Sequence, residues 1–111
     1  MVSLMTSSQS LFNTVLNFIN DFKGKHPAEI EDVFSNGYCY WFAEILHQRF
    51  NGIIYYLPIK NHFITKINGK YFDITGEVIP DEKVYEWEYY ANFDYLDYNR
   101  VVKNCILKCD F

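Results

Sequence analysis

The chain has 111 residues, of which half are apolar and a fifth aromatic, and its formal net charge is −4. This length suits one domain with a single hydrophobic core, and the composition excludes a disordered chain, which would be polar and poor in aromatic residues. The acidic balance disfavours general binding to nucleic acid, because such binding needs Lys and Arg to neutralise phosphates. We therefore expect a single domain over residues 1–111 that does not bind nucleic acid.

The sequence also bears on the cellular compartment. Its apolar runs are shorter than the roughly 20 residues that a membrane-spanning helix needs. Residues 1–10 contain no Lys or Arg, whereas a secretory signal begins with a basic segment. The cysteines Cys39, Cys105 and Cys109 are few and odd in number, which favours reduced thiols over a disulfide scaffold. We expect a cytoplasmic protein without membrane contact.

The first half of the chain has the pattern of three helices. Apolar residues recur at helical spacing and predict an amphipathic helix over about residues 9–22. Pro27 suits the first turn of a second helix, which the pattern extends to about residue 34. A third helix is expected over about residues 39–50, because an apolar face recurs there until an Asn-Gly pair ends it.

The middle of the chain has the pattern of a β-sheet. Residues 53–59 are β-branched and aromatic and predict a strand, and residues 62–67 predict a second one. Asn68-Gly69 is a strong hairpin signal, so residues 70–75 are expected to return as a third strand. A last helix or strand is expected over about residues 93–108. The order predicts an α+β fold, with the N-terminal helices packed on an antiparallel sheet.

Cys39 is the first candidate for chemistry. It follows the helix-breaking residues Ser35-Asn36-Gly37 and stands at the expected start of a helix. Free backbone amides and the helix dipole at such a position favour the thiolate, which is the nucleophilic form of cysteine. The same amides can bind the oxyanion of a tetrahedral intermediate. The alternative is a small buried apolar residue, which is what most free cysteines are.

A thiol nucleophile needs an imidazole, and His62 opens a strand of the expected hairpin. The Asn68-Gly69 turn sets a register that places Asp73 diagonally opposite His62, on the same face of the sheet and roughly 7–8 Å away at the backbone. Asp73 can then hold the imidazole in one orientation and stabilise its charged form. The alternative is that both are ordinary surface residues.

Four short segments resemble transglutaminase-like domains of the papain-like superfamily. Gly-Tyr-Cys-Tyr-Trp-Phe-Ala at residues 37–43 resembles the nucleophile segment, in which Gly-x-Cys opens a helix. Residues 51–53 resemble the Gly-Ile step into the sheet, and residues 62–64 resemble the strand that carries the histidine. Asp-Ile-Thr at residues 73–75 resembles the family's Asp-Pro-Thr, with Ile in place of Pro. The order and spacing of these segments agree with the family.

The resemblance implies a papain-like or transglutaminase-like fold and a catalytic triad. Cys39 would be the nucleophile, His62 the general base and Asp73 the orienting carboxylate, acting on a protein or peptide amide. Tyr38 and Asn36 are the candidates for the oxyanion side chain. Peptidases, amidases, deamidases and transglutaminases share this machinery, so the reaction stays open among them. No zinc-type spacing and no phosphate-binding Gly-rich loop is present, and we expect neither metal nor cofactor.

Residues 81–98 combine Tyr and Trp with acidic residues. One interpretation is a solvated edge over the core, and the other is a surface that binds a basic protein, because Tyr and Trp are common interface anchors. The candidate contacts are Tyr85, Glu86, Trp87 and Glu88. The second function hypothesis is accordingly a small acidic interaction or inhibitor protein without enzyme activity. Cys105 and Cys109 are expected to be structural thiols.

Overall fold

The computed structural model describes the backbone of residues 4–107 and the side chains of residues 9–107. The helices occupy the two ends of this range and are α1 Leu4–Lys23, α2 Pro27–Ser35, α3 Cys39–Phe50, α4 Tyr90–Phe93 and α5 Tyr95–Val101. The strands lie between them and are β1 Ile53–Leu57, β2 His62–Ile67, β3 Lys70–Asp73, β4 Gly76–Val78 and β5 Tyr85–Glu86. Two short turns complete the C-terminal part, namely the 3-10 turn η1 Trp87–Tyr89 and the π-helical turn η2 Val102–Ile106.

The five strands form one antiparallel sheet in the order β4-β3-β2-β1-β5. Asn68 and Gly69 form the turn between β2 and β3, and both have positive φ angles, 51° and 84°, which a tight hairpin turn of this kind requires. The turn pairs Ile67 with Lys70 and Thr65 with Phe72. This is the register expected from the sequence, and it brings the end of β3 back towards the start of β2.

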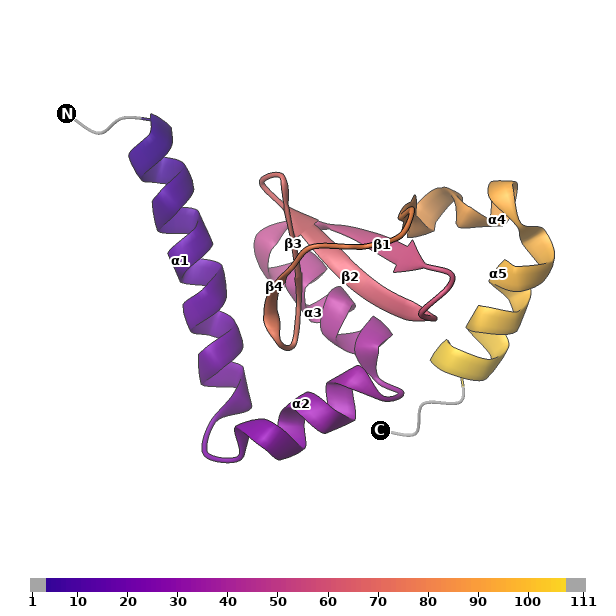
Figure 1. The fold of residues 1–111 in the computed structure, drawn as a ribbon, viewed down its shortest axis with the longest axis horizontal. Helices are drawn as coiled ribbons and strands as arrows, with labels where there is room; N and C mark the ends of the chain where they lie inside the picture. Colours follow the sequence, from indigo (N-terminus) through magenta and orange to yellow (C-terminus); the bar gives the residue numbers. More distant parts are fainter. Residues whose placement is uncertain (1–3, 108–111) are drawn as a thin grey trace.

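The helices and the sheet form the expected α+β architecture. Figure 1 shows α1 along one side of the molecule and α4 and α5 at the opposite side, with α3 packed against the sheet between them. The Thr65 hydroxyl is fully buried and donates a 2.9 Å hydrogen bond to the carbonyl oxygen of Ala43, which joins β2 to α3. Because α3 contacts β2 more extensively than any other strand, its first turn has a fixed position relative to the strand.

Two groups of buried side chains make up the core. The first core cluster joins the three N-terminal helices to β2 and β3, and it consists of Val15, Ile19, Phe34, Phe42, Leu46, Ile67, Phe72 and Ile74. The second core cluster joins α3, β1 and β2 to the C-terminal helices, and it consists of Ala43, Tyr56, Phe63, Trp87, Tyr90 and Val101. Helix α3 contributes to both clusters and so connects them.

The sequence-based boundaries agree with the structure in the first two thirds of the chain. Helix α3 and strand β2 have the predicted limits, and α1 begins at Leu4, earlier than the expected residue 9. The third strand ends at Asp73 instead of residue 75, because the chain turns there into β4. Strand β1 ends at Leu57 instead of residue 59, and the sequence pattern does not predict strands β4 and β5. The C-terminal segment is helical within residues 95–106, and Cys109 lies outside the described residues. None of the helices in residues 4–107 combines the length and apolar character that crossing a bilayer requires.

Candidate active site

Cys39 is the first residue of α3, and the preceding residues explain why the helix starts there. Helix α2 ends at Ser35, and Gly37 has a φ angle of 126°, which turns the chain and is strained for any residue with a side chain. The carbonyl oxygen of Tyr38 then accepts hydrogen bonds from the amides of Trp41 and Phe42, at 3.1 and 3.2 Å. The backbone amides of the first turn at Cys39 therefore lie at the positive end of the helix dipole.

His62 and Asp73 are brought together by the hairpin. The Nε2 atom of His62 lies 2.9 Å from Oδ2 of Asp73, and the two side chains are only 19% and 13% exposed. The second carboxylate oxygen, Oδ1, accepts hydrogen bonds from the amide of Thr75 at 2.8 Å and from its hydroxyl at 2.5 Å. Thr75 closes the Asp-Ile-Thr segment, and Asp followed two residues later by Thr is the spacing of an Asx turn. Both oxygens of Asp73 are thus held in place.

The Cys39 thiol is close enough to His62 to raise the pKa of its imidazole, which is also hydrogen-bonded to Asp73. Burial by itself lowers the pKa of His62, but the hydrogen bonds with Asp73 and Cys39 and their charges outweigh it and raise the pKa to about 9. Burial raises the pKa of Asp73, but the hydrogen bonds from His62 and Thr75 lower it below its usual value overall. The favoured state at neutral pH is therefore an imidazolium beside a carboxylate.

The two candidates for an oxyanion side chain have other roles in the structure. The amide nitrogen of Asn36 donates to the backbone oxygen of Asp32 at 3.1 Å and to its Oδ1 at 2.8 Å, so Asn36 caps the end of α2. Both of these hydrogen bonds use the side-chain amide that an oxyanion donor would offer, and the role of Asn36 at an oxyanion stays a prediction. Tyr38 is half-buried, and its ring packs against Phe34 with a centroid distance of 6.3 Å. The backbone amides at the start of α3 are further hydrogen-bond donors beside Cys39.

The candidate partner residues of the C-terminal part divide between core and surface. Trp87 is 9% exposed and packs between Phe63 and Tyr98, at centroid distances of 4.9 and 4.8 Å, so its assignment to a binding surface is wrong. Tyr85 and Glu86 are half-buried in β5, and Glu88 is exposed. Acidic neighbours favour a surface position for Trp87, but its ring packs on Tyr56 of β1 and Phe63 of β2 in the second core cluster.

Four of the exposed apolar side chains lie shortly after Trp87, between residues 89 and 96. They are Tyr89, Phe93, Tyr95 and Leu96, which are 54%, 60%, 66% and 81% exposed. The ring of Phe93 packs on Tyr85 at a centroid distance of 4.3 Å, so this exposed surface continues into the half-buried part of β5. We call these four residues the aromatic edge.

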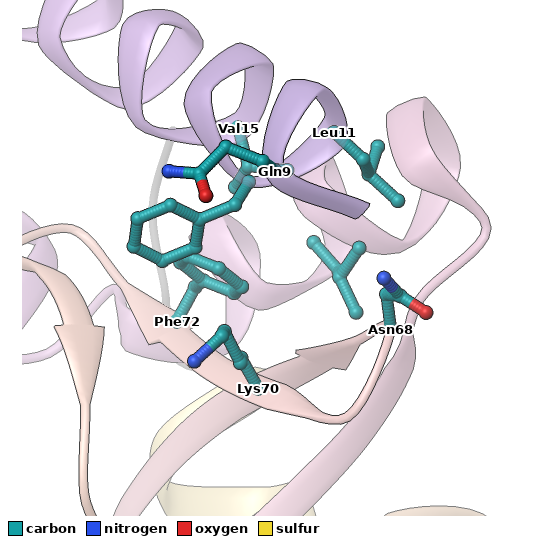
Figure 2. A pocket seen from close by; sticks show the side chains of 8 residues that line it. Gln9, Leu11, Val15, Asn68, Lys70 and Phe72 are labelled. Carbon is teal, nitrogen blue, oxygen red and sulfur yellow. The ribbon is translucent and has the colours of Figure 1, made fainter. Parts of the chain in front are cut away.

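A cavity of about 410 Å³ lies at the opposite end of β2 from His62. Figure 2 shows that it opens between α1 and the β2–β3 hairpin, and its lining consists of Gln9, Leu11, Phe12, Val15, Ile67, Asn68, Lys70 and Phe72. Strand β2 separates the two places by its whole length, since His62 begins the strand and Ile67 ends it. The cavity is therefore not part of the site around Cys39. Within residues 4–107, no group of three His, Cys, Asp or Glu residues is arranged to hold a metal ion.

A family model described as Phage YunG-like protein matches residues 15–104, a range that contains Cys39, His62 and Asp73. No curated protein and no solved structure matches the chain.

Proposed function

This chain belongs to the phage YunG-like protein family, and we propose that it is a cysteine-nucleophile acyl-transfer enzyme that acts on a protein or peptide amide. The observation that carries the proposal is the buried hydrogen-bonded pair of His62 and Asp73, with Cys39 at the start of α3 close enough to act on the imidazole. A thiol, an imidazole and an orienting carboxylate in this order are the parts that thiol acyl transfer needs.

The proposed roles follow from which ring nitrogen of His62 is occupied. Asp73 holds Nε2, which leaves Nδ1 for the thiol of Cys39. An imidazolium in this position attracts a thiolate as an ion pair, and the thiolate is the form of cysteine that attacks. His62 then acts first as the acid of the reaction, and its role as a base is confined to the second half.

The reaction proceeds in two balanced steps. In the first step, the Cys39 thiolate forms a bond to the carbonyl carbon of the amide, and the oxyanion accepts hydrogen bonds from the backbone amides at the start of α3. The carbon–nitrogen bond then breaks as His62 gives its proton to the leaving amine. In the second step, water or an amine attacks the thioester and gives its proton to His62, and the Cys39 thiolate leaves. Water gives hydrolysis or deamidation, and an amine gives transfer.

The arrangement of elements supports a papain-like or transglutaminase-like fold for the chain. A nucleophile helix, α3, packs on an antiparallel sheet, and the histidine and the acid stand at the facing ends of consecutive strands. Gly52 marks the close approach between the end of α3 and β2, because a Cβ atom there would lie 2.6 Å from Thr65 Cγ2 and 2.8 Å from Ile67 Cγ1. This is a physical reason for the Gly-Ile step in the resembling segment. We also propose a cytoplasmic location, in which the Cys39 thiol stays reduced.

The test compares the rates at which the three cysteines react with iodoacetamide, measured by peptide mass spectrometry between pH 5 and 10. At pH 7, Cys39 is expected to react roughly tenfold faster or more than Cys105 and Cys109, because the thiolate is the reacting form. His62→Gln is expected to remove most of this advantage, whereas His26→Gln, an exposed histidine at the start of α2, serves as the control. Equal rates for the three thiols, or an unchanged rate in His62→Gln, would exclude the proposed role.

The aromatic edge favours a second candidate function, binding of a basic protein. Its four side chains are exposed beside acidic residues, of which Glu88 is exposed and Asp94 half-buried. Exposed aromatic groups supply contact area, and acidic neighbours favour a basic partner and speed its association. This function does not need the thiol of Cys39.

The second candidate is tested with a Lys- and Arg-rich peptide that contains aromatic residues, followed by NMR. Shift changes are expected to centre on Tyr89, Phe93 and Tyr95 and to weaken with rising salt, since screening acts over about 10 Å at 0.1 M. Replacing Glu86 and Glu88 by Lys is expected to weaken binding. Replacing the exposed Asp21 and Glu29 by Lys changes the net charge by the same amount and is the control. Shift changes spread evenly over the surface would argue against a dedicated binding face.

A further inference from the structure

Asn61 stands directly before His62, in the turn between β1 and β2. Its φ angle is 54°, in the left-handed region that Asn tolerates better than other residues with a side chain. Because β2 begins at His62, the backbone of Asn61 sets the direction in which the strand and its first side chain leave the turn. A group that holds Asn61 therefore also influences where the imidazole points.

The side chain of Asn61 is held by residues that are distant in the sequence. Its Oδ1 accepts a hydrogen bond from the hydroxyl of Tyr56 at 2.5 Å and one from Nη2 of Arg100 at 3.4 Å. Its Nδ2 donates to Sγ of Cys105 at 3.4 Å. Tyr56 lies on β1, Arg100 on α5 and Cys105 on η2, so the carboxamide joins the sheet to the C-terminal helices.

Arg100 is itself fixed from several sides. Its Nε donates to Oδ1 of Asp97 at 2.8 Å, and its Nη2 donates to the hydroxyl of Tyr56 at 3.3 Å. The other oxygen of Asp97 accepts a 2.6 Å hydrogen bond from the hydroxyl of Tyr90, which is buried. Burial raises the pKa of Tyr56 to about 12, so its hydroxyl keeps the proton that it donates to Asn61. The result is a continuous network from the second core cluster to the residue before His62.

We propose that this network, Asn61 with Tyr56 and Arg100, is a positioning device that holds His62 against Cys39 and Asp73. That this positioning serves catalysis rests on the proposed function. In this arrangement the C-terminal helices contribute to the site although Arg100 does not touch the reacting groups. Small displacements of a catalytic group are costly, since about 1 Å of misplacement can reduce a rate roughly a hundredfold.

The strand offers a matched control at its other end. Asn68 follows β2 as Asn61 precedes it, and its φ angle of 51° is nearly the same. Asn68 lies in the hairpin and lines the cavity of Figure 2, remote from His62. Replacing either residue by Gly removes the same carboxamide and keeps the left-handed backbone accessible. The two variants therefore differ in which end of β2 loses its anchor.

The experiment compares Asn61→Gly, Asn68→Gly and Arg100→Gln with the unchanged chain. The first readout is the pKa of His62 from the pH dependence of its imidazole proton resonances, with Asp73 and Cys39 as the ionisable groups that contact the ring. In Asn61→Gly and Arg100→Gln this pKa is expected to fall from about 9 towards the ordinary value of 6.5, because the ring is held less closely to its partners. The second readout is Cys39 alkylation, expected to slow roughly tenfold or more.

Asn68→Gly is expected to leave both readouts unchanged. The inference is overturned if Asn61→Gly and Arg100→Gln keep the His62 titration of the unchanged chain, or if Asn68→Gly alters it to the same extent. The NMR titration does not depend on activity. If Cys39 reacts no faster than the other thiols, the proposed enzyme function fails, whereas the His62 titration still decides whether the network positions the ring.

Discussion

The two core clusters differ in chemistry, and the difference shows how the fold is divided. The first core cluster contains only Val, Ile, Leu and Phe side chains, so its contribution is exclusion of water and close packing. The second core cluster contains Tyr56, Trp87 and Tyr90, whose rings are buried while two hydroxyls enter the network around Arg100. Hydrocarbon packing thus fixes α3 on the sheet, whereas the polar side of the second cluster reaches the turn before His62.

The candidate site lies where the two clusters meet. Ile74, next to Asp73, belongs to the first cluster, and Cys39 packs against the second. His62 connects the two through its contacts with Asp73 and Cys39. A substitution in either cluster is therefore expected to affect the site. In the first cluster it would do so by destabilising the whole fold, and in the second cluster by displacing His62.

The largest predicted effect concerns the first cluster. Phe42 is 1% exposed and packs against Phe22 and Phe34, at centroid distances of 5.0 and 5.8 Å. Phe42→Ala is expected to lower the free energy of unfolding by about 3–5 kcal/mol, because it removes a buried ring and leaves a cavity. Urea denaturation measures the loss. Phe93→Ala, at a position 60% exposed, is the control with the same change, and a comparable loss there would show that burial does not set the cost.

The second prediction concerns the pair of ionisable groups between the clusters. The pKa of His62 is raised from 6.5 to about 9, so its contribution to stability is complete below pH 6.5 and is lost as the pH rises through 9. The pKa of Asp73 is lowered, so its contribution is present above its ordinary value near 3.8 and is lost as the pH falls through the lowered value in the folded state. The pair is therefore expected to stabilise the fold most between these limits.

Comparison of the unchanged chain with His62→Gln measures this effect. The difference between their free energies of unfolding is expected to shrink by about 3 kcal/mol between pH 6 and pH 10, since the pKa rises from 6.5 to about 9 and one pKa unit corresponds to about 1.4 kcal/mol. Denaturation at several pH values supplies both curves. A difference that stays constant over this range would mean that His62 does not change its proton affinity on folding.

Much of this arrangement was predictable from local signals. The break at residues 35–37 and the apolar face that follows set the limits of α3, and the Asn68-Gly69 turn fixed the register that brings Asp73 to His62. Turn chemistry and helical periodicity act within a few residues, so they can be recognised in one sequence. This explains why the expected register, and with it the approach of His62 to Asp73, agrees with the structure.

The rest depends on contacts between distant segments. Strand β5 has two residues and exists because it pairs with β1, so its own sequence carries little strand signal. Trp87 lies in an acidic segment and is nevertheless buried, because its ring packs on the apolar side chains of β1 and β2. The hydrogen bond between Arg100 and Asn61 joins positions 39 residues apart, and neither residue type indicates it. Tertiary packing determines the short strand, the burial of Trp87 and this hydrogen bond, and a local sequence pattern does not indicate tertiary packing.

The smallest predicted effect concerns the polar side of the second cluster. Tyr56 is fully buried, and Tyr56→Phe removes only the hydroxyl that donates to Asn61 and accepts from Arg100. The expected loss in the free energy of unfolding is about 1–2 kcal/mol, because the ring packing stays while two polar partners lose a hydrogen bond. Tyr55→Phe removes the same atom from the neighbouring, half-buried residue of β1, and a smaller loss is expected there. Urea denaturation of both variants gives the comparison. If Tyr56→Phe were as stable as the unchanged chain, the second cluster would be held by apolar packing alone, like the first, and the chemical difference between the two clusters would have no consequence for stability.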